Sequence, residues 1–155
     1  MSKVDVKRLH NITGHRDSVY TLQQADRHNL FFSGSGDGMV VLWNLEHPDE
    51  GELIAKLPHS VYALHVHRPT GLLVAGHNYD GIHVIDWKNK QAGGSLKMTK
   101  AAIFDIQSMG NRIFVADGAG SLTELDLQNL AISNPQKHSD KSARTIAINP
   151  ASAEL

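Results

Sequence analysis

Three polar side chains near the start of the chain are of the types that hydrolases use for nucleophilic catalysis. His15, Ser33 and Asp37 supply an imidazole, a hydroxyl and a carboxylate, the set in which a base and an orienting acid activate a nucleophile. The serine lacks the Gly-x-Ser-x-Gly elbow that exposes the nucleophile in one large class of hydrolases. We therefore predict no catalytic residue in this chain.

Histidine is the residue type best suited to bind a metal here, because ten histidines are present and cysteine is absent. His65 and His67 alternate along one apolar run, so they point to the same side of an extended chain, and His83 follows in the same part of the sequence. Such a set suits zinc, copper or nickel. Because no carboxylate or cysteine completes a recognisable motif, we predict neither a metal nor a cofactor, and polar packing is the simpler interpretation.

The glycine-rich segment 33–38 has the composition of a loop that cradles a phosphate. It lacks the Gly-Lys-Ser/Thr that ends such a loop, and no helix begins after it. Glycines supply positive φ angles in hairpin turns, so we interpret the segment as a turn between two strands.

Length and composition describe one ordinary globular domain. The 155 residues are 41% hydrophobic and 20% charged, enough for a core. A net charge of −1 leaves no excess of positive charge for a phosphate backbone, so nucleic-acid binding is not expected. No apolar run is long enough to span a membrane, and the N-terminus lacks the apolar core of a secretory signal. We expect a cytoplasmic protein without a membrane partner.

The sequence contains an internal repeat, and this repeat determines where the polar residues discussed above lie in the fold. The apolar run that begins at Val19 recurs at Val61 and at Ile103, each time 42 residues later, and a fourth copy begins at Ala143. Each copy continues with a turn, a second apolar run, a glycine-rich turn, an alternating run and a more polar stretch. A period of this length indicates units that bury their faces against one another.

The apolar runs are short, rich in β-branched and aromatic residues and bounded by turn signals, a pattern typical of strands. No stretch shows sustained helical periodicity. We predict an all-β protein in which each repeat forms a four-stranded antiparallel sheet, with third strands at 39–45, 82–87 and 122–127.

Gly14-His15, the turn 32–38 and Trp43-Asn44 mark the first repeat most clearly. With these motifs the chain resembles the WD40-repeat β-propeller family. The resemblance implies a WD40-type propeller with four-stranded antiparallel blades, about half of a seven-bladed ring. Later repeats match less well, since Leu57 stands where His15 aligns and Ala119 where the turn aspartate aligns.

The resemblance also implies a structural tetrad, a hydrogen-bonded set of side chains that ties one blade together. Its members here are His15, Ser33, Asp37 and Trp43. The chemistry is reasonable, because Asp37 can accept from the imidazole and the indole N–H can donate to the Ser33 hydroxyl.

Repeat counting predicts one domain, 1–155, that is an incomplete propeller of about three and a half repeats. We expect the repeats at 14–56, 57–98, 99–138 and 139–155, the last one incomplete, and an outer strand of a preceding or closing blade at 4–10. The chain is then either half of a larger ring or a half-ring that closes by self-association. Since end blades need neighbours, we predict self-association or a complex with a polypeptide that supplies the missing blades.

Tyr20, Tyr62 and Phe104 occupy one equivalent position in three repeats, and Arg144 occupies it in the fourth. Val61 and Tyr62 are consecutive apolar residues, and this break in alternation predicts a β-bulge. In the WD40 family the position lies near the top rim of the central channel, so the resemblance implies candidate partner-binding residues; packing between blades is the alternative.

The function that we expect is a non-catalytic scaffold that binds a protein or peptide through its top face and blade surfaces. The alternative is a propeller that binds a ligand or metal in its central channel, or acts there as an enzyme. A convergent cluster of titratable side chains at one channel mouth would favour the alternative.

Overall fold

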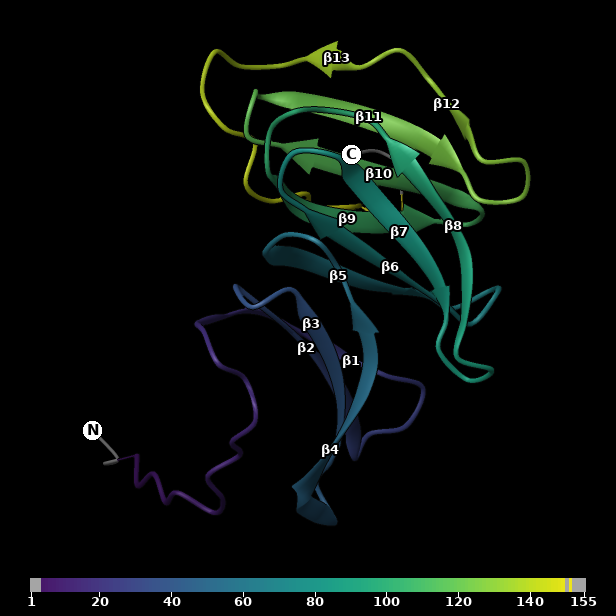
Figure 1. Cartoon of the computed structure of the whole chain (residues 1–155). Coiled ribbons are helices and arrows are strands. Elements are labelled where there is room, and N and C mark those ends of the chain that lie inside the picture. Colours follow the sequence, from purple (N-terminus) through teal and green to yellow (C-terminus); the bar gives the residue numbers. More distant parts are fainter. Residues whose placement is uncertain (1–3, 150, 152–155) are drawn as a thin grey trace.

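The prediction of an all-β fold is confirmed. The computed structural model describes residues 4–149 and residue 151, and these form thirteen strands and no helix. The strands make three antiparallel sheets that follow one another along the chain (Figure 1). We call the sheets blades 1, 2 and 3. They form an open array, as expected for a partial propeller.

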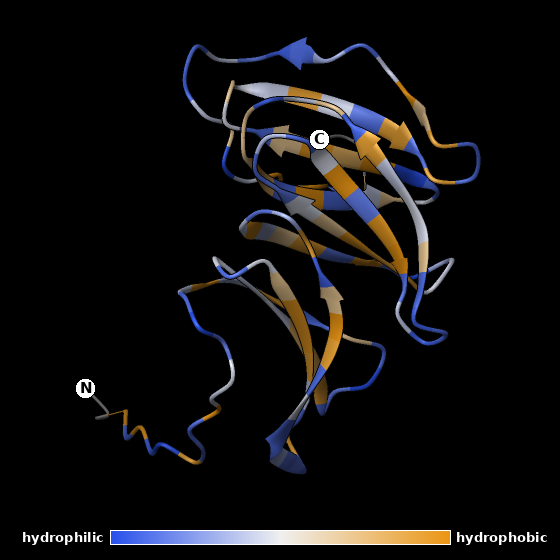
Figure 2. Ribbon diagram, viewed as in Figure 1, coloured by the Kyte–Doolittle hydropathy of each residue, from blue (hydrophilic) through white to orange (hydrophobic). Residues whose placement is uncertain are grey.

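Blades 1 and 2 each have four strands whose order across the sheet follows the chain. The strands of blade 1 are β1 (Val19–Gln24), β2 (Leu30–Ser35), β3 (Met39–Asn44) and β4 (His47–Lys56). The strands of blade 2 are β5 (Val61–His67), β6 (Leu72–His77), β7 (Gly81–Asp86) and β8 (Gln91–Lys97). Apolar residues lie along the strands and polar residues at the turns between them (Figure 2).

Blade 3 has three full strands, and two short strands pair with its third strand, β11. The strands are β9 (Ile103–Met109), β10 (Arg112–Asp117), β11 (Ser121–Asp126), β12 (Ala131–Ile132) and β13 (Gln136–Lys137). The third strands of all three blades thus end one residue before the predicted limits, and two of them begin one residue earlier.

Neither of the two strands expected at the ends of the chain forms. Residues 4–10 are exposed and pair with none of the described strands, and residues 143–148 run beside blade 3 without a strand ladder. A strand needs an edge that satisfies its backbone groups, and 4–10 meets no such edge here. By comparison with the other repeats, we expect the fourth copy to have a turn at 149–152 and the start of a second strand at 153–155; both lie largely outside the described residues.

The core lies in the two seams between consecutive blades. One buried apolar cluster joins blades 1 and 2, and a second joins blades 2 and 3. In the first seam the side chain of Val61 fills the space that a Cβ on Gly34 would take, with its Cγ1 2.7 Å from that position. Ile103 packs in the same way against Gly76 in the second seam. A glycine on the second strand therefore lets the next blade approach closely.

The glycine-rich segment 33–38 holds the end of β2 and, at residues 36–38, the turn between β2 and β3, so the turn is shorter than expected. Gly38 adopts a positive φ of 76° there, as the turn interpretation expects. Gly34 serves the close contact with Val61 instead, so the glycines of this segment have two separate structural roles.

Candidate functional site

The four residues of the expected tetrad form one chain of hydrogen bonds inside blade 1. The Trp43 indole donates from Nε1 to the Ser33 hydroxyl over 2.7 Å, and Ser33 Oγ lies 2.6 Å from His15 Nε2. His15 Nδ1 lies 3.1 Å from an Asp37 carboxylate oxygen. Since a carboxylate only accepts, Nδ1 of His15 is the donor there. The chain ties the segment before β1 to β2, to the β2–β3 turn and to β3.

Asp37 is held as a carboxylate by the groups around it. Burial has the largest influence and would raise its pKa, but the backbone N–H groups of Arg16 and Met39 and the His15 side chain together outweigh it. The pKa of Asp37 is therefore lowered to about 2. A carboxylate that accepts several N–H bonds is stabilised in its charged form, so Asp37 fixes both the turn and the ring of His15.

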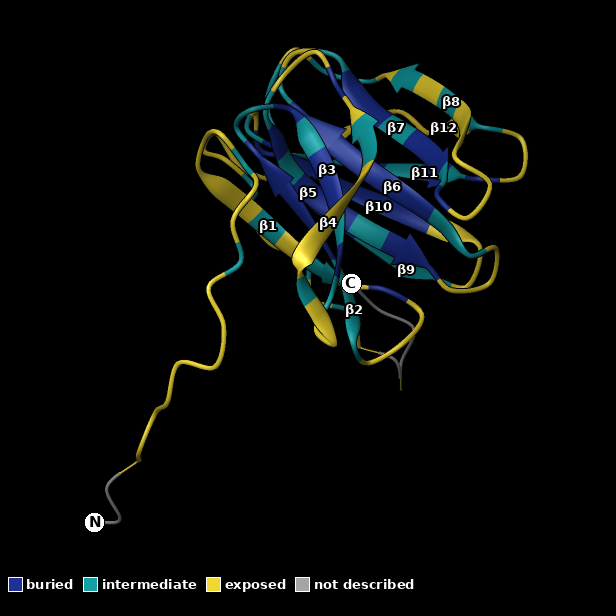
Figure 3. Cartoon of the chain, turned by 60° about the horizontal axis from the view of Figure 1, so that its bottom comes forward, coloured by how far each residue is buried: buried dark blue, intermediate teal, exposed yellow. Residues whose placement is uncertain are grey.

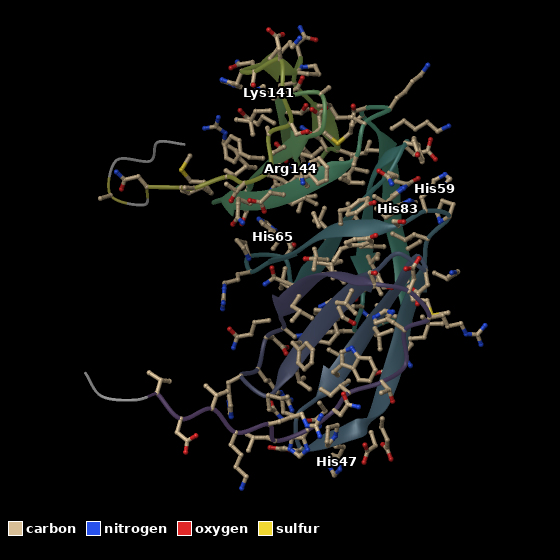
Figure 4. All side chains as sticks on the ribbon, turned by 90° about the vertical axis from the view of Figure 1, so that its left-hand side faces the viewer. His47, His59, His65, His83, Lys141 and Arg144 are labelled. Carbon is tan, nitrogen blue, oxygen red and sulfur yellow. The ribbon has the colours of Figure 1, made fainter. Side chains whose placement is uncertain are left out.

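A second set of residues crosses all three blades on one edge of the molecule. The ring centroids of Tyr20 and Tyr62 are 4.5 Å apart, and those of Tyr62 and Phe104 are 5.7 Å apart. The guanidinium carbon of Arg144 lies 4.5 Å from the Phe104 centroid. Figure 4 shows Arg144 beside the sheet of blade 3. We call these four residues the aromatic row.

Bulges in the first strand of each blade orient the rings of the aromatic row. The register of each first strand shifts at Tyr20, Tyr62 and Phe104 against the second strand, so the predicted bulge near Tyr62 is confirmed and recurs in the other blades. A bulge turns a side chain away from the regular alternation of its strand. Three successive bulges thus bring three rings from separate blades into contact.

The aromatic row is open to solvent along much of its length. Tyr20 is 48% exposed, Arg144 is exposed, and Tyr62 and Phe104 are partly buried. The pKa of the Tyr20 hydroxyl is raised, first by the charge that Tyr62 would carry beside it. The Asn78 side chain donates to the Tyr62 hydroxyl over 3.4 Å. Sequence reasoning missed Asn78, and its place in a repeat turn two residues before Asp80-Gly81 was the available signal.

The three histidines considered for a metal do not converge. His65 Nε2 contacts the Ser108 hydroxyl at 2.8 Å, and His67 donates from Nε2 to the Gly110 carbonyl. Both bonds cross the seam between blades 2 and 3. His65 and His67 therefore make polar contacts between the two blades. Figure 4 shows His65 on the opposite side of the ribbon from His59 and His83.

His83 instead pairs with His77, a residue that sequence reasoning did not single out. Their Nε2 atoms are 2.9 Å apart, and His77 donates from Nδ1 to the Asn78 carbonyl. Burial, the main cause, lowers the pKa of both imidazoles. Within residues 4–149, no group of three or more histidine, aspartate or glutamate side chains is placed to hold a metal ion. No helix in that part of the chain is long and apolar enough to cross a membrane.

Comparisons with known proteins agree with the repeat and the fold. The family model "WD domain, G-beta repeat" matches residues 6–44, the region that holds the tetrad. No curated protein matches the chain significantly.

Three solved structures share the arrangement of the blades. The computationally designed Ika4 protein has a TM-score of 0.74 at 18% identity, over 93% of this chain and 88% of that one. U3-55K has a TM-score of 0.75 at 12% identity, over 84% of this chain and 42% of that one. The designed Ika8 protein has a TM-score of 0.73 at 18% identity, over 89% and 42%. The chain thus spans less than half of the last two structures, and identities this low show the fold alone.

Proposed function

Because the chain belongs to the WD40-repeat β-propeller family, as an incomplete propeller, we propose that it is a non-catalytic scaffold that binds a protein or peptide through the aromatic row. WD40 repeat domains are generally protein-interaction scaffolds. The finer proposal, that this row is the binding surface, is based on its geometry in this chain.

The observation that carries the proposal is the continuity of the aromatic row across two seams. Isolated exposed aromatic residues are common on protein surfaces. The side chains at four equivalent positions of successive repeats contact one another in sequence, with an arginine at one end. They form an extended surface that includes residue types that dominate binding energy at interfaces. Aromatic side chains with few rotatable bonds lose little entropy when a partner binds.

The burial and the hydrogen bonds of Ser33 support the non-catalytic part of the proposal. Its hydroxyl contacts His15 Nε2, and His15 contacts Asp37, as in a catalytic set. Ser33 is, however, only 2% exposed. Its oxygen already accepts the indole N–H of Trp43, and it lies within a regular strand rather than on a sharp elbow. Within the described residues, the hydrogen bonds of the Ser33 hydroxyl join it to His15 and Trp43 and so connect parts of blade 1.

The proposal includes assembly. We expect the chain to self-associate or to join a polypeptide that supplies further blades, because a blade buries its faces only between two others. Neither nucleic acid nor a membrane is among the expected partners, given a net charge of −1.

Selection from a random-peptide phage library on the immobilised chain tests the proposal directly. Peptides that bind should lose about 1–3 kcal/mol of binding free energy when Tyr62 is changed to alanine. The matched control is Leu53→Ala, which removes a half-exposed apolar side chain from β4, away from the row. Affinity capture with the Tyr20→Ala/Tyr62→Ala variant extends the test to natural partners.

Two results would overturn the proposal. One is that selected peptides bind the Tyr62→Ala and wild-type chains equally. The other is that Tyr20→Ala, at the exposed end of the row, unfolds the chain as a core substitution would. Circular dichroism melting of each variant separates lost binding from lost folding.

A further inference from the structure

Three adjoining hollows follow the seam between blades 1 and 2, outside its buried core. The largest, of about 470 Å³, lies between the outer strands β4 and β8. Lys90 lines both this hollow and the second, of about 390 Å³. The second shares Asp26, Trp87 and Lys88 with the third, of about 180 Å³. We call the three hollows together the seam groove. Figure 3 shows β4 and β8 mostly exposed beside the more deeply buried β3 and β7.

The charged side chains of the seam groove are mostly basic, although the whole chain has a net charge of −1. Two carboxylates line the groove, those of Asp26 and Glu52. The basic side chains that line it are those of Arg27, Lys56, Arg68, Lys88 and Lys90. The largest hollow has two of these lysines and no carboxylate among its lining residues. The groove therefore carries an excess of positive charge, to which an acidic partner is attracted.

The lysines of the seam groove are accessible to the carboxylates of a partner. Lys88 pairs with Asp26 at 2.7 Å, and Lys90 pairs with Glu52 at 2.5 Å. These four side chains are between 39% and 62% exposed, and exposed ion pairs contribute little to stability. The Lys56 ammonium donates to a backbone carbonyl of the β2–β3 turn, which leaves its charge without a counter-ion. An acidic partner can therefore recruit these lysines at small cost in stability.

The second seam, between blades 2 and 3, is closed at the equivalent place. Lys90 and its repeat counterpart Leu130 end matching turns, with φ angles of 55° and 54°. Leu130 packs against the second core cluster, and its Cδ1 lies 3.2 Å from where a Cβ on Gly94 would stand. Lys90 instead reaches Glu52, which holds on β4 the position that Gly94 holds on β8. The first seam is thus open and charged where the second is closed and apolar.

Apolar side chains form the floor between these charges. Ile54 lines the largest hollow, and Leu30 and Leu42 line the second. All three are only partly buried against the first core cluster, so another apolar side chain can cover them. The strands β4 and β8 are the outer strands of their sheets, and lysines beside such edges disfavour pairing with a like-charged strand. An extended peptide alternates the direction of its side chains, so it can set apolar groups on the floor and carboxylates beside the lysines.

We propose that the seam groove binds an extended acidic segment of a partner protein, with apolar residues between its aspartates or glutamates. Lys56, Lys88 and Lys90 pair with the carboxylates, and Leu42 and Ile54 pack against the apolar side chains. Complementary charge of this kind speeds association and selects the partner. The groove shares no lining residue with the aromatic row, so this is a second binding surface, beyond the proposed function.

A charge reversal tests the site. The probe is selected on the immobilised full chain from short peptides that have aspartate or glutamate at every second position and random residues between them. Lys90→Glu should raise the dissociation constant of the selected peptide about tenfold or more, because attraction becomes repulsion at close range. Lys137→Glu on blade 3 is the matched control, since Lys137 is 61% exposed against 62% for Lys90 and also pairs with a carboxylate. It should leave the constant unchanged.

A steric block tests the groove without a change of charge. Ala92→Trp fills part of the largest hollow, which Ala92 lines, and should weaken the same peptide about tenfold or more. Ala131→Trp, at an exposed alanine of β12, should have no effect. The peptide with glutamine in place of every acidic residue should not bind. Circular dichroism melting shows that each variant remains folded.

Several results would overturn the proposal. They are a selection that yields no binding peptide, equal effects of Lys90→Glu and Lys137→Glu, and full binding by the Ala92→Trp chain or by the glutamine peptide. Displacement of the peptide by a single-stranded oligonucleotide of equal charge would identify a nucleic-acid site instead. The Tyr62→Ala chain should bind the acidic peptide as the wild type does, so failure of this inference is distinguishable from failure of the proposed function.

Discussion

The ring centroid of Tyr62 lies 4.5 Å from that of Tyr20, although the two residues are 42 positions apart in the sequence. The repeat period brings them to equivalent places, a bulge at each turns the ring out of its strand, and the seam between blades sets the distance. The aromatic row therefore depends on how closely the blades pack. A change that widens a seam would also separate the rings.

Removing the Trp43 side chain should destabilise the chain strongly. Trp43 is 3% exposed and donates a hydrogen bond to Ser33, so Trp43→Ala should cost about 3–5 kcal/mol in the free energy of unfolding. Trp43→Phe keeps most of the packing and leaves Ser33 without its donor, which should cost about 1–2 kcal/mol. Urea unfolding followed by circular dichroism measures both. A loss below about 1 kcal/mol for Trp43→Ala would show that the indole is not part of the core.

Asp37 should make stability depend on pH in the acid range. Its folded pKa is lowered to about 2, so the folded state binds the proton less readily than the unfolded state does. The stabilisation is then fully present above about pH 4 and is lost as pH falls toward 2. Asp37→Asn should remove roughly 1–2 kcal/mol of this acid-dependent change. Urea midpoints measured from pH 2 to pH 7 would show it, and an unaltered slope in the variant would contradict it.

Much of the site could be predicted because it repeats or uses local chemistry. The period of 42 residues predicts where the strands of each repeat lie. The residue types of Ser33 and Asp37 near a tight turn indicate the hydrogen-bonded set that blade 1 contains. The position of Tyr20 and its counterparts comes from the repeat alone. Each of these features is determined within one repeat or by comparison of one repeat with the next.

What the sequence did not reveal depends on contacts between units. Residues 143–148 alternate like a strand, but a strand also needs a paired edge, and pattern alone does not show whether one exists. The hydrogen-bond acceptor of His67 Nε2 is a carbonyl on the neighbouring blade. No local sequence pattern specifies this acceptor. An ion pair in blade 3, between Arg112 and Glu124, could have been found, since charges stand where two other repeats have apolar residues.

Because of His65, the free energy of unfolding should decrease as the pH falls below neutrality. Burial, the main cause, lowers the folded pKa of His65 to about 4, below the usual value near 6.5. Between those two pH values the unfolded state takes up a proton that the folded state does not, so stability falls from about pH 6.5 down to about pH 4. His65→Gln should remove on the order of 1–2 kcal/mol of that fall. Melting temperatures across this range test it, with exposed His28→Gln as the control that should change nothing.

The contact of Gly34 with Val61 should make the first seam sensitive to the size of the side chain at residue 34. A Cβ at residue 34 would stand 2.7 Å from Val61 Cγ1 and 2.8 Å from Thr21 Cγ2, so Gly34→Ala forces both neighbours to move. Overpacking of this kind costs about 1–3 kcal/mol. Val61→Ala, on a fully buried side chain, should also destabilise the chain, by leaving a cavity.

The double variant Gly34→Ala/Val61→Ala separates this contact from other effects. The new methyl group then occupies part of the space that the valine left, so the two losses should be less than additive by about 1 kcal/mol or more. Urea unfolding of the four chains gives the coupling free energy. Strict additivity would mean that the blades do not meet at this pair. Since blades 2 and 3 repeat the contact at Gly76 and Ile103, the same cycle there should give a coupling of the same sign.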